Sequence, residues 1–319
     1  MIEDRLAVGV DLGGTAIKVG LVSPKGKILK KEELKSHAEK GPDAVVKQII
    51  KGINLVAEGN WEKIIGVGIG SPGSVFIKKG TVENPPNFPG WGKVPLGSMI
   101  KKKIKKDVYV ENDANAAAIG ELIFGAGKAF DNFVLITLGT GVGGGVIINK
   151  EIYRGENGAA GEIGHMTIDG NGPKCNCGSY GCIEAYIGNS YLIARVLKEL
   201  HQYPKSKIHR LMKDDGSSLT PKLIHEAALL NDKYARSIIE DIGLKLGVVL
   251  GSVVNLLDVT NIIIGGGVSG FGELLFNAVE KRTKERVMKP LKEKIKVIPA
   301  KLKNEAGVKG ASALVFYKS

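Results

Sequence analysis

The same succession of strand and turn patterns occurs twice in this chain of 319 residues. Residues 6–35 read as an apolar strand, a glycine turn, a second strand, a short turn and a third strand, and residues 132–155 repeat that order. Residues 12–13 and 138–139 are both Leu-Gly at matching places, and Gly20-Leu21-Val22 matches Gly145-Val146-Ile147. A long internal repeat of this kind indicates two similar folding units. We therefore expect an α/β protein with two similar domains, each opening on an antiparallel meander.

Other segments carry helical and strand patterns outside the repeat. Residues 41–59 have apolar side chains at helical spacing after a Pro-Asp start. Helical patterns dominate residues 186–256, with a polar loop near residues 213–218, and residues 261–270 run from an apolar strand into glycines. Residues 307–318 read as a final helix that returns to the first domain.

The expected domain boundary follows the end of the first set of patterns. We place a small N-terminal α/β domain at residues 1–113 and expect a C-terminal helix at about 303–319 to return to it. A larger domain then spans residues 114–302 and contains all three cysteines. The total length suits two domains, or one domain divided by a cleft.

Composition and charge exclude several classes of protein. The 43% hydrophobic content is enough for a packed core, and the acidic N-terminus before a short apolar run is neither a signal peptide nor a membrane span. The net charge of +12 comes mostly from scattered lysines. The one tight run, Lys101 to Lys106, has no interleaved aromatic residues, which favours a solvated helix face over a nucleic-acid surface. We expect no nucleic-acid partner and no membrane partner.

The cysteines form the most distinctive cluster of the chain. Three cysteines and one histidine make a Cys3His set of the type that closes a tetrahedral zinc site: His165, Cys175, Cys177 and Cys182. Four protein ligands leave no position for water, so a structural zinc ion fits better than a catalytic one. No cysteine is left for a disulfide, which favours a reducing, cytoplasmic location.

Two acidic residues flank this cluster. Glu162 precedes the histidine in GEIGH, and Glu184 follows the last cysteine in GCIEA. A site that only stabilised a loop would not need them. We therefore expect zinc to hold one ring nitrogen of His165 while the other nitrogen faces a substrate together with the two glutamates.

Three glycine turns follow apolar strands, at residues 11–15, 138–145 and 264–270. Glycine lets backbone amides approach a phosphate closely, and Thr15 or Thr140 can add a hydroxyl donor. None of the turns fits the Walker pattern, and a hairpin rather than a helix follows the first, which argues against a dinucleotide fingerprint. Asp11 either lies near the metal ion of a nucleotide, through water, or caps the turn.

Asn112 and Asp113 stand where an apolar strand enters an alanine-rich helix. Asp113 there is either a helix cap or a general base at the end of a strand, with Asn112 beside it to bind hydroxyls. The loops at residues 71–73 and 84–91 supply further polar groups. Many carboxylates and amides with few cations suit a neutral polyol as substrate.

Four motifs in this order, DLGGT, TLGTGVGGG, GEIGH and CNCGSYGCIE, resemble the ROK family of sugar kinases and repressors. That family belongs to the actin-like, ribonuclease H-like ATPase superfamily that includes hexokinase. The resemblance covers residues 8 to about 310 and implies two such domains around a cleft, with ATP, Mg2+ and a structural Zn2+ as cofactors. The larger domain would carry the zinc site and much of the nucleotide site.

The resemblance also implies a role for each candidate residue. Asp113 would be the catalytic base, and the sugar hydroxyls would contact Gly73, Asn87, Asn112, Glu162, His165 and Glu184. ATP would be bound with Asp11 near Mg2+, Gly266 and Gly267 beside the adenosine, and the phosphates on Gly13, Gly14, Thr15, Gly139, Thr140 and Gly141. The zinc ligands would be His165, Cys175, Cys177 and Cys182. Because the glycine turns lie elsewhere in the sequence, chelation of zinc should weaken sugar affinity before ATP affinity.

The activity that the resemblance implies is ATP-dependent phosphorylation of glucose at its 6-hydroxyl. Kinases for N-acetylmannosamine, N-acetylglucosamine and other hexoses share most of these residues and stay open as alternatives, as does polyphosphate as the donor. A sugar-responsive repressor is disfavoured because the first strand begins by residue 7, which leaves no room for a helix-turn-helix domain. The resemblance further implies a homo-oligomer, a dimer or a tetramer.

Overall fold

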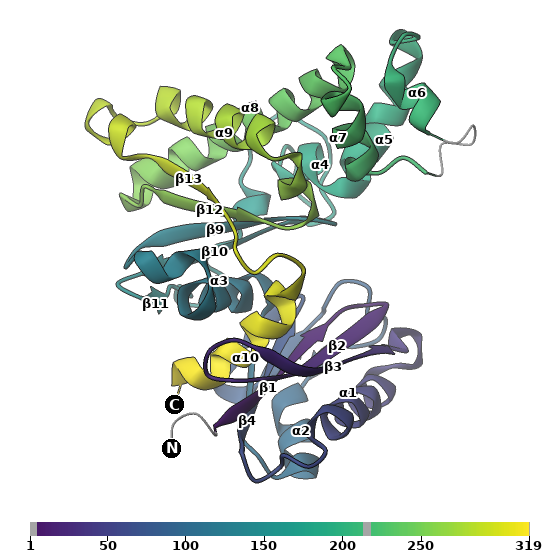
Figure 1. The fold of residues 1–319 in the computed structure, drawn as a ribbon, viewed down its shortest axis with the longest axis vertical. Coiled ribbons are helices and arrows are strands. Elements are labelled where there is room, and N and C mark those ends of the chain that lie inside the picture. Colours follow the sequence, from purple (N-terminus) through teal and green to yellow (C-terminus); the bar gives the residue numbers. More distant parts are fainter. Residues whose placement is uncertain (1–4, 213–217, 319) are drawn as a thin grey trace. The chain divides into compact units, whose positions relative to one another are not determined.

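The computed structural model describes residues 5–212 and 218–318. They form two compact units (Figure 1). Of the described residues, unit 1 comprises 5–131, 145–161 and 301–318, and unit 2 comprises 132–144, 162–212 and 218–300. Among the described helices, none combines the length and the hydropathy that crossing a bilayer requires.

The sheet of unit 1 confirms the expected meander. Its strand order is β3-β2-β1-β4-β8, with β1 antiparallel to β2, β2 antiparallel to β3, and β4 and β8 added in parallel. Parallel strands need crossover connections, and helices supply them here. The strands are β1 (Leu6–Leu12), β2 (Ala16–Val22), β3 (Ile28–Lys35), β4 (Ile64–Ser71) and β8 (Val108–Asn112).

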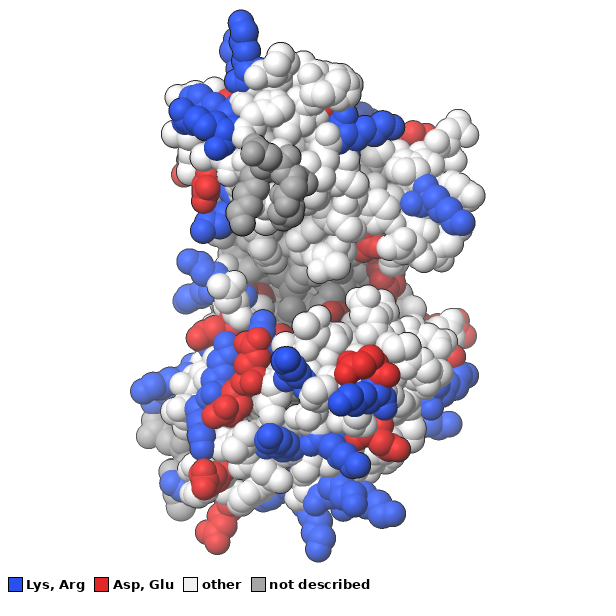
Figure 2. Space-filling view, turned by 90° about the vertical axis from the view of Figure 1, so that its right-hand side faces the viewer, with Lys and Arg blue, Asp and Glu red and all other residues white. Residues whose placement is uncertain are grey.

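Helices cover this sheet with apolar faces. Helix α1 (Pro42–Ala57) lies where helical spacing predicted it, and it buries Val45, Ile49 and Ile53 completely. Burial of one such side chain contributes roughly 1.5–3 kcal/mol. Helix α2 (Leu96–Ile104) buries Leu96 and Ile100 and leaves its lysines exposed, so the lysine run is a solvated helix face as expected. Figure 2 shows basic and acidic side chains side by side over unit 1, at its lower end.

The C-terminal helix α10 (Ala306–Lys318) packs against β1, β4 and α3 (Asp113–Phe124) within unit 1 (Figure 1). Glycines make this approach possible. A methyl group at Gly68 of β4 would lie 1.8 Å from the backbone oxygen of Ala311, and one at Gly120 of α3 would lie 2.7 Å from the Cα atom of Gly310. Backbone therefore packs on backbone, and only glycine fits at these positions.

The contacts of α3 also set the limits of unit 1. The expected boundary at residue 113 follows the sequence repeat, whereas unit 1 extends to residue 131 because α3 packs on α10 and β4. Residues 145–161 belong to unit 1 as well. The division at residue 113 stays a prediction about the two repeated halves.

A small second sheet in unit 1 has no counterpart in the expectations. Strands β5 (Ser74–Phe76), β6 (Thr81–Glu83) and β7 (Lys93–Val94) pair in the order β5-β6-β7, beside the loops expected at residues 71–73 and 84–91. Strands of two or three residues are too short to show a period in the sequence, and prolines lie between β6 and β7.

The other large sheet repeats the order of the first, as the internal repeat predicted. Its order is β11-β10-β9-β12-β13, with β10 and β11 antiparallel and with β12 parallel to both β9 and β13. The four-residue strand β13 was not expected. The strands are β9 (Phe133–Leu138), β10 (Val142–Ile148), β11 (Glu151–Ile152), β12 (Asn261–Gly265) and β13 (Lys296–Pro299).

The helices of unit 2 confirm the helical patterns. They are α4 (Glu184–Ile187), α5 (Asn189–Glu199), α6 (Lys207–Leu211), α7 (Pro221–Leu229), α8 (Lys233–Leu257) and α9 (Glu273–Arg286). Three glycines four residues apart on α8 let α9 approach: methyl groups at Gly243, Gly247 and Gly251 would lie 2.4–2.5 Å from side-chain atoms of α9. The predicted polar loop near residues 213–218 falls almost entirely outside the described residues.

Candidate active site and metal centre

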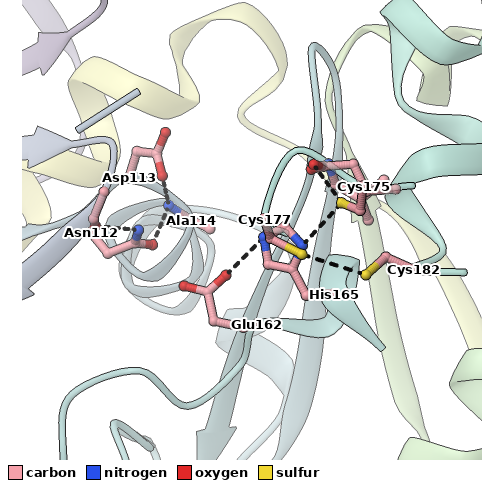
Figure 3. A network of polar contacts seen from close by, with 11 residues as sticks. Asn112, Asp113, Ala114, Glu162, His165, Cys175, Cys177 and Cys182 are labelled. Atoms are coloured by element: carbon pink, nitrogen blue, oxygen red, sulfur yellow. Dashed lines mark hydrogen bonds and ion pairs between the residues drawn. The ribbon is translucent and has the colours of Figure 1, made fainter. Parts of the chain in front are cut away.

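The four predicted zinc ligands lie together in unit 2. Their ligand atoms all lie within 4.8 Å of one another (Figure 3). The Sγ atoms of Cys177 and Cys182 are 3.6 Å apart, and Cys175 Sγ is 3.8 Å from Nδ1 of His165. Tetrahedral zinc with Zn–S bonds of about 2.3 Å separates two sulfur ligands by about 3.8 Å. The cluster therefore fits a structural zinc ion.

The acidity of the three thiols differs with their surroundings. Burial raises the pKa of Cys175 and raises the pKa of Cys182 to about 12. A backbone hydrogen bond from Ser179 lowers the pKa of the exposed Cys177. Zinc binds thiolates, so metal binding must displace protons from the two buried thiols.

His165 presents its two ring nitrogens to different partners. Nδ1 faces the sulfur of Cys175, and Nε2 lies 3.9 Å from Oε2 of Glu162. The short 3-10 helix that holds the histidine (Ile163–His165) begins directly after that glutamate, which places both side chains on one short segment. Glu162 is exposed, and its carboxylate is open to solvent. The expectation that the second nitrogen faces a substrate stays a prediction, and in the structure that nitrogen faces Glu162.

Glu184 connects the metal cluster to a glycine turn within unit 2. Its Oε2 accepts the backbone N–H of Val142 at 2.8 Å, and its Oε1 lies 3.9 Å from Cys175 Sγ. A methyl group at Gly141 would come within 2.2 Å of Oε2, so glycine there lets the turn pack on this carboxylate without displacing it. The sequence did not indicate this connection.

The Asn112–Asp113 pair lies at the junction of β8 and α3 in unit 1. Asn112 is the helix cap: its Oδ1 accepts N–H bonds from Ala114 at 3.0 Å and Asn115 at 3.2 Å (Figure 3). Its Nδ2 donates to the carbonyl of Gly73 at 3.3 Å. Asp113 is therefore not the helix cap but the first helical residue, and it is exposed. Oδ1 of Asp113 also accepts the backbone N–H of Ala114 at 2.8 Å, so this carboxylate takes part in the start of the helix as well (Figure 3).

The remaining predicted residues of unit 1 border the first glycine turn. Gly73 has a φ of 84°, which glycine adopts without strain, and Asn87 is exposed with a φ of 65°. A methyl group at Gly14 would lie 2.8 Å from Cβ of Asn87, so the turn at residues 11–15 and the loop at residues 84–91 are in contact. The structure thus brings a predicted phosphate residue beside a predicted sugar residue.

Asp11 is largely buried at the end of β1. Its carboxylate lies beside Gly307 in the first turn of α10, where a methyl group would come within 2.3 Å of Oδ2. Burial raises the pKa of Asp11, and Lys18 and Lys31 oppose that shift. The two roles that the sequence left open for Asp11, a turn cap or a group near a metal ion, both stay predictions.

The glycine turns expose backbone as phosphate binding requires. Within the described residues, the N–H groups of Gly14 and Thr140 have no hydrogen-bond partner. Gly266 has a φ of 86°, and a methyl group there would lie 2.2 Å from the carbonyl oxygen of Leu138. The glycine turns at residues 138–145 and 264–270 are therefore in contact. Gly139 and Gly267 border open space. Thr15 and Thr140 are exposed, as is Gly267, while Gly13 donates its N–H to Ala16 at 3.0 Å.

An ion pair of unit 1 that sequence reasoning missed bonds the Asn112–Asp113 junction. Glu111 is 2% exposed, and its Oε2 accepts bonds from both Nε and Nη2 of Arg154 at 2.9 Å. Its Oε1 accepts the backbone N–H of Asn112 at 3.0 Å. A glutamate inside an otherwise apolar strand was the available signal, because a buried carboxylate needs a partner.

Comparisons with known proteins agree with the motifs. A protein named glucokinase from Thermotoga maritima is 38% identical over 97% of this chain and 96% of its own length. The structure of a ROK family glucokinase from Streptomyces griseus in complex with glucose and AMPPNP superposes with a TM-score of 0.85 at 34% identity. It covers 97% of this chain and 98% of that chain.

Regulators match as well as enzymes. A xylose repressor from Bacillus subtilis is 32% identical over 97% of this chain, which spans 76% of the repressor. The family model described as ROK family matches residues 7–318, which include both glycine-turn hairpins, the Asn112–Asp113 junction and the cysteine cluster. The chain belongs to the ROK family.

Proposed function

We propose that this chain transfers the γ-phosphoryl group of ATP to the 6-hydroxyl of glucose. The observation that carries the proposal is the exposed carboxylate of Asp113 at the end of β8, held in place by a separate cap residue, in a chain of this family. The glucokinases among its relatives, and the glucose in the structure from Streptomyces griseus, support glucose as the sugar.

Asp113 would act as the general base. Phosphoryl transfer depends mainly on positioning and on charge stabilisation, and a base accepts the proton of the attacking hydroxyl. Asn112 caps α3 with its Oδ1, and Asp113 accepts the N–H of Ala114 through its own Oδ1, so Oδ2 of Asp113 would take the proton. A group that must accept a proton has to remain accessible, and Asp113 is exposed.

The proposed sugar contacts of unit 2 are Glu162, His165 and Glu184. Glu162 and His165 share one segment, and the metal cluster fixes the orientation of the imidazole. Glu184 retains Oε1, the oxygen near Cys175, as a potential acceptor, because Oε2 already binds the amide of Val142. Bound zinc would supply fixed geometry to this segment rather than a reactive water. The sugar residues of unit 1 would be Asn112, Asp113, Gly73 and Asn87.

ATP would be bound by the three glycine turns. The unpaired N–H groups of Gly14 and Thr140 would donate to phosphate oxygens, and the exposed hydroxyls of Thr15 and Thr140 would add donors. Asp11 would lie near the Mg2+ ion of the nucleotide, where oxygen ligands are preferred. Gly13, Gly139 and Gly141 would shape the turns, and Gly266 and Gly267 would border the adenosine.

The test is phosphorylation of a panel of hexoses and N-acylhexosamines with Mg-ATP, followed by coupled ADP release. We expect the highest kcat/KM with glucose. Activity with no sugar of the panel contradicts the kinase proposal. A preference of tenfold or more in kcat/KM for an N-acyl sugar contradicts glucose as the substrate. Inorganic polyphosphate in place of ATP tests the donor.

Assembly and location complete the proposal. We propose a homo-oligomer, which light scattering after size exclusion measures directly. We also propose a cytoplasmic location, which the three free cysteines support because they lie in one metal-type cluster.

A further inference from the structure

We propose that Glu111 and Arg154 form a positioning pair that holds the Asn112–Asp113 junction in its reactive geometry. The inference rests on the proposed function, since it concerns the same base. It assigns a task to a buried ion pair that touches neither of the predicted substrates.

Glu111 has a donor on each side of its carboxylate. Oε1 accepts the backbone N–H of Asn112 at 3.0 Å and Nδ2 of Asn115 at 3.3 Å. Oε2 accepts Nε and Nη2 of Arg154, each at 2.9 Å. One buried side chain therefore bonds the backbone N–H of the residue before Asp113 and the side chain of a residue in the first turn of α3.

Because Glu111 is buried, the orientation of its carboxylate depends on the guanidinium of Arg154. The side chain of Glu111 is 3% exposed and that of Arg154 is 21% exposed. A buried carboxylate without a cation is strongly disfavoured, so the carboxylate keeps its orientation only while the guanidinium is present. The planar fork of arginine fixes direction as well as charge, which lysine does not.

The arginine is itself anchored within unit 1. It follows β11, where the backbone N–H of Ile152 donates to the hydroxyl of Tyr317 on α10 at 3.0 Å. Tyr317 also donates to Glu151. These bonds hold the segment that carries Arg154 in place. The guanidinium in turn orients the carboxylate of Glu111, which bonds the end of β8.

A cavity of about 790 Å3 gives access to the arginine from solvent. Arg154 lines it together with residues 155–158 and the β5–β6 hairpin. A guanidinium ion added in solution can therefore reach the position that Arg154→Ala leaves empty. This access makes chemical rescue a direct test of positioning.

The experiment compares kcat and the two KM values of Arg154→Ala and Glu111→Gln with those of the unchanged chain. We expect kcat to fall on the order of 100-fold, the effect of a small misplacement of a reacting group, while KM for ATP stays unchanged. Guanidinium chloride, at concentrations below those that unfold the protein, should raise kcat of Arg154→Ala saturably. It should not raise kcat of Glu111→Gln, which retains its arginine.

A matched control is Arg195→Ala in unit 2. Arg195 also forms a partly buried ion pair, with Asp241 at 2.8 Å, and it contacts no predicted substrate residue. We expect its kcat to stay near that of the unchanged chain, with no response to guanidinium. Guanidinium rescue of all variants alike, or kcat within twofold of normal in both Arg154→Ala and Glu111→Gln, overturns the proposal.

A second measurement does not depend on activity. Hydrogen exchange of the segment 108–116 should be faster in Arg154→Ala than in the unchanged chain, because Asn112 loses a fixed acceptor for its N–H. Unchanged exchange there overturns the positioning role even if the protein phosphorylates no sugar. Failure of the kinase proposal alone would instead leave this difference in exchange intact.

Discussion

Replacing Asp113 by asparagine tests the proposed base with little disturbance of the fold. Asp113 is the first residue of α3 and is exposed, while Asn112 provides the cap through bonds of 3.0 and 3.2 Å. The substitution removes one negative charge near the helix N-terminus, where such a charge contributes about 0.3–1 kcal/mol. Folded domains are stable by about 5–15 kcal/mol, so the variant should remain folded.

The expected loss of activity is several times larger than this loss of stability. A general base contributes about 100- to 10,000-fold to the rate, which corresponds to roughly 3–5.5 kcal/mol of barrier. We therefore expect kcat to fall by at least about 100-fold. A stability loss below about 1 kcal/mol lowers Tm by only a few degrees.

The assay is coupled ADP release at saturating glucose and Mg-ATP, with glucose affinity measured by calorimetry. We expect affinity to change little, since an asparagine amide still binds hydroxyls. Asp43→Asn is the matched control, because Asp43 is also an exposed acid in the first turn of a helix, α1. A kcat of Asp113→Asn within tenfold of normal refutes the assignment, as does an equal loss in Asp43→Asn.

Three further perturbations follow from the structure. Removing zinc by chelation or by Cys182→Ser should weaken the binding of both glucose and ATP, measured by calorimetry, and retention of full ATP affinity would contradict the connection through Glu184. Asp11→Asn should raise Tm at neutral pH while lowering activity. Burial raises the pKa of Asp11 in the folded state, so ionisation of this carboxyl lowers the free energy of unfolding. The loss develops as the pH rises from about 4, the pKa in the unfolded chain, through the pKa in the folded protein. Thermal scans across that range should show the two Tm curves converge on the acid side, and a constant gap would argue against this cause. Gly68→Ala should cost about 1–3 kcal/mol by overpacking against α10 in urea unfolding, whereas Gly170→Ala, with open space around it, should cost much less.

The sequence predicted those parts of the fold that depend on local patterns. Strands β1, β2 and β3 alternate or run apolar between glycine turns, and α1 has a full helical period. The repeat then predicted the second sheet, whose strand order matches the first. The zinc ligands were also readable, because residues 175–182 are close in sequence and only His165 had to be added.

The unpredicted features depend on contacts between distant residues. Glu111 and Arg154 lie 43 positions apart, and nothing in a single sequence pairs one arginine with one buried glutamate. The fit of Gly68 against Ala311 is of the same kind, because a glycine in a strand does not say which backbone approaches it. A sequence pattern predicts which face of a helix or strand is buried, but it does not predict which residues pack on that face.

Glu184 shows how this limit changes the expectation for zinc. The glycine turn at residues 138–145 is remote in sequence from the cysteines, which favours an effect of zinc on sugar binding alone. In the structure, one carboxylate bonds the amide of Val142 at 2.8 Å and lies 3.9 Å from Cys175 Sγ. Loss of a bound metal would free Cys175 and change the charge that Glu184 faces, which would loosen the carboxylate against which Gly141 packs. Zinc removal should therefore disturb the proposed phosphate turn together with the proposed sugar residues.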